Sequence, residues 1–407
     1  MKITKQIIRI FIWTSTVVCI VAAFLLYFYG DINKIKSRIE KNLKEKLNCN
    51  IKLGELEWDF EGLKVGVSTK EISIFDPQDN LVLQAGPSRA VWHIEHIIRG
   101  NYAHFHTIQT SNLYLNAIRH KNTKWNFIEM FPPGPAPEAD NLKLNNCIIH
   151  LIDELNPLER SILYKDFNII FEKKPFSKIR EINLTTRVGS FTGLPFLHVK
   201  GEYTESKKFN WKKNKIDLNI DAKNIRLADW EPYLTSWPQI KKVDGNFTGI
   251  IQIKKDKGRK FIKLRTKSKT SNLAVELQNK EGTQTIKIPK TGLGLNAIID
   301  EKKININYFK SSIDKLSYNI KGTILNWSRA LPEINLYLRT NKFNFKAVKP
   351  YLPLSLLPPD TRARIEPIND DGFIKLDLNL KGPAIAPRYF GEILLTDFNL
   401  TPESGLD

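Results

Sequence analysis

The chain has few cysteines, and this scarcity excludes a fold held together by disulfides. Three cysteines occur in 407 residues, and one of them, Cys19, lies inside an apolar run. Cys49 and Cys147 could pair in an oxidising compartment, but a single bridge does not make a disulfide framework. Because 42% of the residues are hydrophobic and 10% aromatic, the chain can bury a core without covalent support.

Motifs of common catalytic sites are also lacking. The sequence shows no phosphate-binding glycine loop, no nucleophile elbow and no paired carboxylates in an apolar segment. Gly292 and Gly294 indicate a turn or a strand. Four histidines fall in one short span: His93, His96, His104 and His106. The set of carboxylate or cysteine partners that a metal site needs is not grouped with them, so solvated surface histidines are expected rather than a metal site. We therefore expect no enzyme, no metal and no cofactor.

Acidic residues are outnumbered by basic ones. The chain has 62 Lys and Arg against 43 Asp and Glu, a net charge of +19. Such a charge suits a nucleic acid, an anionic membrane surface or an acidic polymer. The basic residues are scattered and form no dense stripe or known nucleic-acid module. This distribution favours an anionic membrane surface as partner and argues against nucleic acid.

One long apolar run is present, at residues 10–29. Twenty residues in a helix span about 30 Å, the thickness of a bilayer's hydrocarbon core, so the run is predicted to be a transmembrane anchor. Its defining residues are Ile10, Phe11, Trp13, Phe24, Leu25, Leu26, Tyr27 and Tyr29. More basic residues follow the run than precede it, so the positive-inside rule alone would keep the long C-terminal part in the cytoplasm.

After the anchor, residues 31–47 have the apolar spacing of a short amphipathic helix, which could lie on the membrane or pack on the next domain. From Ile51 onward the apolar residues alternate with polar ones, as in half-buried strands. A short helix is expected near Val91 to Arg99. The Pro-rich stretch at residues 132–137 is the best candidate for a linker, and we place a module boundary there.

The later half contains an internal repeat. Residues 216–234 align without a gap on residues 334–352, and both copies end in Pro-Tyr-Leu. Each unit is predicted to contain two strands, a short helical turn and another pair of strands. Similar β units that stack on their neighbours form an elongated sheet.

The repeat strands have one strongly apolar face. Its predicted members are Ile216, Leu218, Ile220, Ile334, Leu336, Leu338, Leu376, Leu378 and Leu380. In a closed sandwich a second sheet would bury this face, whereas in a long open sheet it would line a groove for acyl chains. Periodicity alone does not separate these alternatives.

Several ordered motifs resemble AsmA-like proteins, a superfamily that includes TamB-like and YhdP-like members. These motifs are the anchor and helix, residues 51–56, residues 66–77, residues 97–100, the hairpin at residues 120–127, and residues 372–383 with 391–400. In the hairpin, Thr123 stands where the family usually has glycine.

The resemblance implies a single-pass protein of the cell inner membrane with its bulk in the periplasm. It also implies a β-groove that carries phospholipids toward the outer membrane. The expected modules are the anchor (1–30), the amphipathic helix (31–48), an N-terminal AsmA-like β module (49–137), and β-groove repeats at 138–245 and 246–407, the last continuing beyond the chain end. The alternative is a scaffold for outer-membrane protein assembly, whose partners would be outer-membrane or periplasmic proteins bound by strand addition.

Overall fold

A computed structural model describes residues 32–46, 49–99, 104–120, 126, 138–154, 161–175, 177–188, 196–204, 214–230, 240–279, 282–327, 331–352, 362–363, 371–384 and 387–398. The fold is mainly β, and the chain divides into two compact units, Met1–Leu144 and Asn145–Asp407. This division lies past the Pro-rich stretch, inside strand β9 (Glu138–Asp153). The predicted anchor at residues 10–29 lies outside the described residues.

The first described element of the first unit is helix α2 (Asn33–Lys46), as the sequence predicts for this segment. The Asn33 side chain exchanges two hydrogen bonds with the backbone of Leu56, donating at 2.9 Å and accepting at 2.8 Å. Glu40 Oε1 accepts a hydrogen bond from the Leu53 amide at 2.8 Å. These contacts fix α2 against the first strands of the unit.

The remaining elements of the first unit are short. They are β1 (Asn50–Leu53), β2 (Leu56–Glu61), β3 (Lys64–Thr69), β4 (Ile72–Phe75), β5 (Leu81–Ala85), β6 (Ser88–His93), α3 (Ile94–Ile98), β7 (His104–Ser111) and β8 (Tyr114–Arg119). One antiparallel ladder runs β2–β3–β6–β7–β9 and the other β1–β4–β5–β8. The helix expected near Val91 to Arg99 is shorter than predicted, because Val91 to His93 extend β6 and pair with β3.

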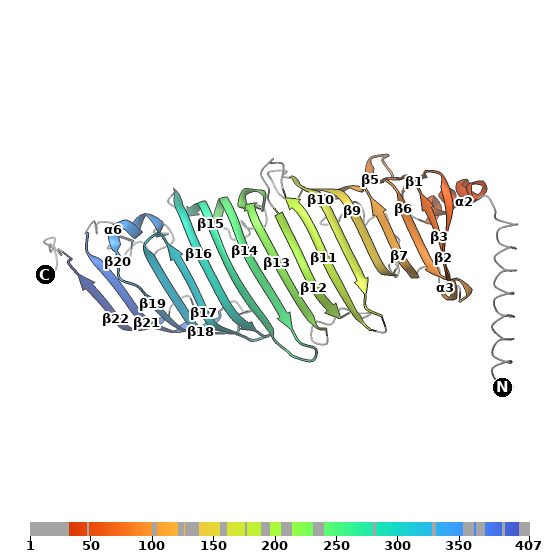
Figure 1. Ribbon diagram of the computed structural model, residues 1–407. Helices are drawn as coiled ribbons and strands as arrows, with labels where there is room; N and C mark the ends of the chain where they lie inside the picture. The colour runs from red at the N-terminus through yellow and green to blue at the C-terminus, as the bar shows by residue number, and fades with distance from the viewer. Residues whose placement is uncertain are drawn as a thin grey trace, which may run out of the picture. The chain divides into compact units, whose positions relative to one another are not determined.

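The second unit is an antiparallel meander (Figure 1). After β9 its elements are β10 (Ser161–Lys173), β11 (Ile179–Val188), β12 (Phe196–Thr204), β13 (Ile216–Arg226), η1 (Leu227–Trp230), β14 (Ile240–Lys255), β15 (Ile262–Asn279), β16 (Gly282–Ile299), β17 (Lys303–Ile313), β18 (Leu316–Leu325), β19 (Glu333–Thr340), β20 (Phe343–Asn344), α6 (Phe345–Val348), η2 (Lys349–Tyr351), β21 (Phe373–Pro383) and β22 (Arg388–Thr396). Each long strand pairs with the next along the chain, and β20 adds a short pairing to β21.

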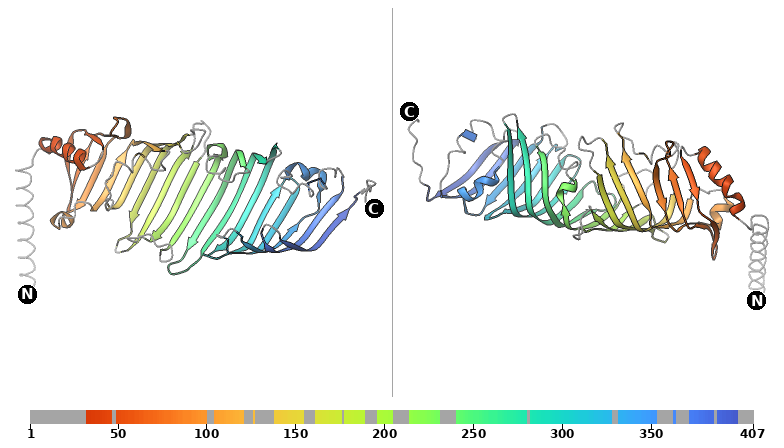
Figure 2. Two further views of the ribbon diagram at one scale, coloured as in Figure 1. Left: turned by 180° about the vertical axis from the view of Figure 1, so that it is seen from behind. Right: turned by 90° about the horizontal axis from the view of Figure 1, so that it is seen from above.

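Bulges curve this sheet. The register shifts between Ala222 and Ile225 in β13 and between Ile306 and Phe309 in β17. Asn224 adopts a positive φ of 51° at the first shift, and its amide donates to Thr248 Oγ1 at 3.0 Å. An extra residue bends a strand and increases its twist, and Figure 2 shows the strands of the second unit bowed rather than flat.

The predicted repeat is present in the strand order. In the first copy β13 leads through η1 into β14, and in the second β19 leads through α6 and η2 into β21. The Asn344 side chain caps α6 by accepting a hydrogen bond from the Ala347 amide at 2.8 Å. Two copies of one strand-turn-strand pattern therefore lie in one sheet.

Buried side chains of the second unit gather in small clusters rather than in one central core. One contains Ile162, Val188, Ala222 and Ile225, another Leu316, Phe343, Phe345 and Val348, and a third Leu277, Ile286 and Ile288. Tyr351 of η2 packs on the third cluster. The short helical turn α6–η2 thus covers part of the sheet at the ends of its strands.

Candidate functional site

The nine predicted groove residues all lie on one face of the second unit's sheet. Residues that are paired across neighbouring strands point to the same side of the sheet. Following the pairs from strand to strand, from β13 to β21, therefore shows which residues share one face. The middle row consists of Leu218, Ile253, Leu264, Ala297, Ile306, Gly322, Leu336 and Leu380. A parallel row consists of Ile220, Ile251, Thr266, Leu295, Phe309, Ile320, Leu338 and Leu378. We call this side of the sheet the apolar face.

The apolar face is open in the part of the chain that the structure describes. All nine predicted side chains are half-buried, neither sealed nor fully exposed. A closed sandwich would bury them under a second sheet, whereas the described residues of this unit form one layer. Of the two alternatives that periodicity left open, the open sheet is the one observed.

The apolar face is not uniformly apolar. The next row toward the buried clusters contains Ser268, Leu293, Ser311, Tyr318 and Thr340. Thr340 Oγ1 accepts a hydrogen bond from the Leu376 amide at 2.9 Å. Hydroxyl groups therefore border the strip formed by the two apolar rows.

Lys255 also belongs to the apolar face. It is paired with Ile216 and only 1% exposed, and its Nζ donates to the Asn214 carbonyl oxygen at 2.7 Å. Burial lowers the pKa of Lys255 because desolvation disfavours the charged form. Sequence reasoning missed this residue, although it continues the alternation of Ile251 and Ile253.

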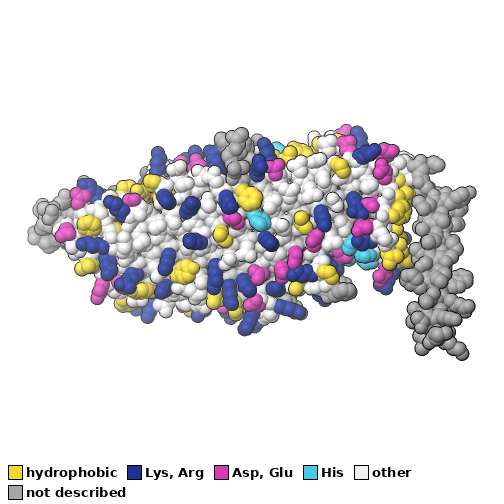
Figure 3. All heavy atoms as spheres, in the orientation of Figure 1, with side chains coloured by type: hydrophobic (Ala, Val, Ile, Leu, Met, Phe, Trp, Pro, Cys, Tyr) yellow, Lys and Arg dark blue, Asp and Glu magenta, His cyan; other side chains and the backbone are white. Residues whose placement is uncertain are grey.

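The opposite side of the sheet, the polar face, is solvated. Its strands carry cross-strand ion pairs, such as Lys254 with Asp217 at 3.5 Å and Arg339 with Asp377 at 3.7 Å. Figure 3 shows a face of the second unit rich in lysine and arginine and poor in hydrophobic side chains. The two sides of one sheet thus differ strongly in polarity.

The first unit carries exposed hydrophobic side chains of its own. Phe60, Leu63 and Ile98 are 54%, 73% and 79% exposed, and we call these three residues the apolar patch. Leu63 and Ile98 line a hollow of roughly 340 Å³ together with Arg99. Hydrophobic side chains gather over this end of the first unit in Figure 3.

The clustered histidines are not the solvated surface residues that the sequence predicts. His104 and His106 are 17% and 21% exposed, and they lie 3.4 Å and 3.8 Å from the carboxylate of Asp140 on β9. The ring centroids of His93 and His106 are 4.2 Å apart. Asp140 could not be associated with the histidines from the sequence, because it follows them by more than thirty residues. Within the described residues, no group of three or more His, Cys, Asp or Glu side chains is arranged to hold a metal ion.

Two further sequence predictions concern cysteines and membrane spans. Cys49 and Cys147 do not form the disulfide that the sequence allows, and both thiols are buried. Burial raises the pKa of the Cys49 thiol. None of the described helices is long and apolar enough to cross a membrane. The anchor residues Ile10 to Tyr29 are not among those described.

Comparisons with known proteins identify no relative. No protein-family model, curated protein or solved structure matches this chain. The apolar face and its surroundings are therefore the features that indicate a function.

Proposed function

We propose that this chain is a membrane-anchored lipid-binding protein whose apolar face holds phospholipid acyl chains and conducts them between the inner and outer membranes of a bacterium. The observation that carries the proposal is the open apolar face, on which the nine predicted aliphatic side chains of β13, β19 and β21 are all half-buried. Exposed apolar surface of this extent is typical of a binding surface rather than of a solvated one.

The dimensions of the apolar face suit an acyl chain. Neighbouring strands lie about 4.8 Å apart, so a row from β13 to β21 extends over about 34 Å. An acyl chain covers one leaflet, which is about half of the 30 Å hydrocarbon core. Each methylene removed from water contributes about 0.8 kcal/mol. One lipid tail can therefore lie along the rows and remain bound outside a bilayer.

The apolar patch supports proximity to a membrane. Phe60, Leu63 and Ile98 are large exposed apolar residues, and the chain carries a net charge of +19. Apolar side chains that enter the headgroup region, together with a basic protein surface, favour anionic bilayers. We infer that the first unit lies at the inner membrane, beside the predicted anchor.

A second candidate function is a scaffold that binds partner proteins by strand addition. The observation that favours it is β22, which pairs only with β21 among the described strands. Five of its large hydrophobic residues are 46–72% exposed: Tyr389, Phe390, Ile393, Leu394 and Leu395. An exposed apolar edge strand is a template for pairing with another chain.

Mass spectrometry of the purified full-length chain tests the lipid proposal. We expect wild-type protein to carry phospholipid and Leu336→Asp to lose most of it, because a carboxylate facing an acyl chain is costly to desolvate. The matched control is Asn335→Asp, which introduces the same charge one residue away on the polar face. If the wild type carries no lipid, or if both variants retain it equally, the lipid proposal fails and the scaffold gains support.

A further inference from the structure

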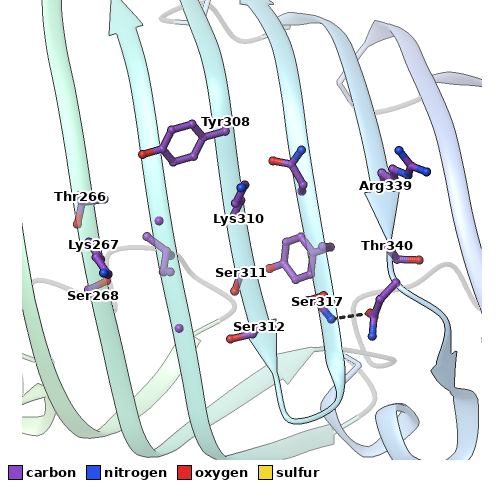
Figure 4. Close-up of a pocket in the computed structure, with 16 residues that line it drawn as sticks. Thr266, Lys267, Ser268, Tyr308, Lys310, Ser311, Ser312, Ser317, Arg339 and Thr340 are labelled. Carbon is purple, nitrogen blue, oxygen red and sulfur yellow. Dashed lines mark hydrogen bonds between the residues drawn. The ribbon is translucent and has the colours of Figure 1, made fainter.

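The polar face of the second unit contains a hollow that the lipid proposal does not use. Its volume is roughly 710 Å³, and all of its lining residues belong to β15–β19 and the turn after β19. This volume is within the range of small-molecule sites, about 300–1,000 Å³. Figure 4 shows the lining side chains on the adjacent strands. We call it the basic hollow.

The cations of the basic hollow alternate with uncharged residues along one row of the sheet. In register across five strands the row reads Lys267, Gly294, Lys310, Asn319 and Arg339. At about 4.8 Å between strands, successive cations are on the order of 10 Å apart. This spacing leaves room for an anion between two cations, over the uncharged residue that separates them.

None of the described residues that line the basic hollow is acidic. The nearest carboxylate on the row belongs to Asp377 of β21. Its Oδ2 lies 3.7 Å from Nε of Arg339. Lys267 and Lys310 are exposed. The hollow is therefore positively charged on both sides of Gly294.

Gly294 forms the floor of the hollow. Neither its backbone conformation nor its neighbours require a glycine at this position. A Cβ built there would meet only Tyr308 Cε2 at 3.8 Å and the Thr266 carbonyl oxygen at 3.9 Å, and its φ is not positive. Glycine in a strand interior costs stability and often marks close approach of a ligand. The effect of Gly294 here is to keep the space between Lys267 and Lys310 empty.

The rim of the hollow offers groups for a hydroxylated ligand. Ser312 and Ser317 line it. So does Asn319, whose Oδ1 is buried and accepts no hydrogen bond from the described residues. Tyr308 (Figure 4) lies close to Gly294, since a Cβ built on Gly294 would be 3.8 Å from Tyr308 Cε2, and Lys310 Nζ lies 5.7 Å from the centroid of the Tyr308 ring. Hydroxyl and amide groups hydrogen-bond to a polyol, while an aromatic ring covers the apolar side of a sugar or glycerol unit.

We propose that the basic hollow binds a phosphate group carried on a small polyol, with the phosphate over Gly294 between Lys267 and Lys310. Charge-assisted hydrogen bonds from lysine to phosphate oxygens are the strong contacts of such a site. Two sources share this chemistry, a free sugar phosphate and the headgroup of a phosphoglycerol lipid. Lys267, Gly294 and Lys310 lie on the side of the sheet opposite the apolar face, so this site can be tested independently of the lipid proposal.

Isothermal titration calorimetry on the full-length chain in detergent tests this site. The probes are glucose 6-phosphate, glycerophosphoglycerol and uncharged glucose. We expect one or both phosphates to bind and glucose not to bind. Tighter binding of glucose 6-phosphate identifies a free sugar phosphate as the ligand class, and tighter binding of glycerophosphoglycerol identifies a lipid headgroup.

Three variants decide whether the hollow itself is responsible. Lys310→Gln removes the central cation and Gly294→Val fills the floor, and each is expected to weaken binding at least about tenfold. Lys263→Gln removes an equivalent cation from β15 outside the hollow, and it is expected to leave binding unchanged. Thermal melting shows whether each variant is folded.

The proposal is overturned if neither phosphate binds the wild-type chain. It is also overturned if folded Gly294→Val binds normally, or if Lys263→Gln weakens binding as much as Lys310→Gln does. Either of the last two results would mean that the lysines act only as a diffuse positive surface.

Discussion

Gly201 lies opposite Leu218 in the same way that Gly322 lies opposite Leu336. A Cβ built on either glycine would collide with a backbone carbonyl oxygen of the facing strand, that of Asp217 or of Asn335. Leu218 and Leu336 are also equivalent positions of the sequence repeat. The two copies therefore share a close backbone approach beside an apolar-face leucine.

Gly322→Ala is predicted to destabilise the second unit by about 1–3 kcal/mol. Gly322 has a φ of 135°, which L-residues rarely adopt, and the added methyl group meets the Asn335 carbonyl. Chemical denaturation of the wild-type and variant chains measures the loss. Gly294→Ala is the control, since its Cβ meets nothing closer than 3.8 Å. Equal effects of the two substitutions would refute the close approach.

The apolar patch is predicted to enter the headgroup region of the bilayer. Ile98→Cys, labelled with an environment-sensitive fluorophore in the reconstituted full chain, should show blue-shifted emission and quenching by spin-labelled lipids. Leu331→Cys is the control, because Leu331 is also an exposed leucine, at 58%, but lies in the second unit. Indistinguishable, water-like emission from both positions would contradict membrane contact by the patch.

Acidification is predicted to destabilise the first unit through His106. Burial, the neighbouring His93 and Lys64 lower the pKa of His106, while Asp140 and Glu61 oppose them. The rings of His96 and His104 lie nearby, with their centroids 4.4 Å apart and their planes tilted by 59°. When the pKa of a histidine is lower in the folded state than in the unfolded state, the unfolded state binds a proton at a higher pH than the folded state does. Stability is therefore lost as pH falls through about 6.5.

Denaturation of wild-type and His106→Gln chains at about pH 7.5 and about pH 5.5 measures this effect. The variant should lose less stability between the two values, and the difference cannot exceed about 1.4 kcal/mol per pH unit for one proton. An identical pH dependence of the two proteins would show that His106 does not contribute.

The exposed edge strand β22 is predicted to cause concentration-dependent association. Ile393→Lys with Leu395→Lys places two charges on the edge, which should disfavour pairing with another chain. Sedimentation of the detergent-solubilised full chain at rising concentration measures association. The control is Leu325→Lys. Leu325 is an exposed residue of β18, and β18 is paired with a strand on each side. No association of the wild type would remove the basis of the scaffold candidate.

The alternation of apolar and polar residues predicted the face on which Leu218, Leu336 and Leu378 lie, because side-chain direction in a strand follows a period of two. The repeat predicted the short helical turns after β13 and β19. These features depend on residues near one another in the chain, so sequence patterns carry them.

Features that depend on long-range register could not be predicted. Lys267, Lys310 and Arg339 look scattered in the sequence, and only the pairing of five strands brings them into one row. Asp140 reaches His104 in the same way, through the pairing of β9 with β7. The choice between open sheet and sandwich was likewise undecided, since both require the same alternation.

Photocrosslinking in living cells can detect lipid bound to the apolar face. A photoreactive phenylalanine analogue is placed at Leu338 on the apolar face or at the adjacent Tyr337 on the polar face, in cells labelled with radioactive phosphate. We expect phospholipid to be crosslinked to the chain at Leu338 and little of it at Tyr337. Absence of lipid at Leu338, or equal labelling at both positions, would contradict the claim that the apolar face carries lipid.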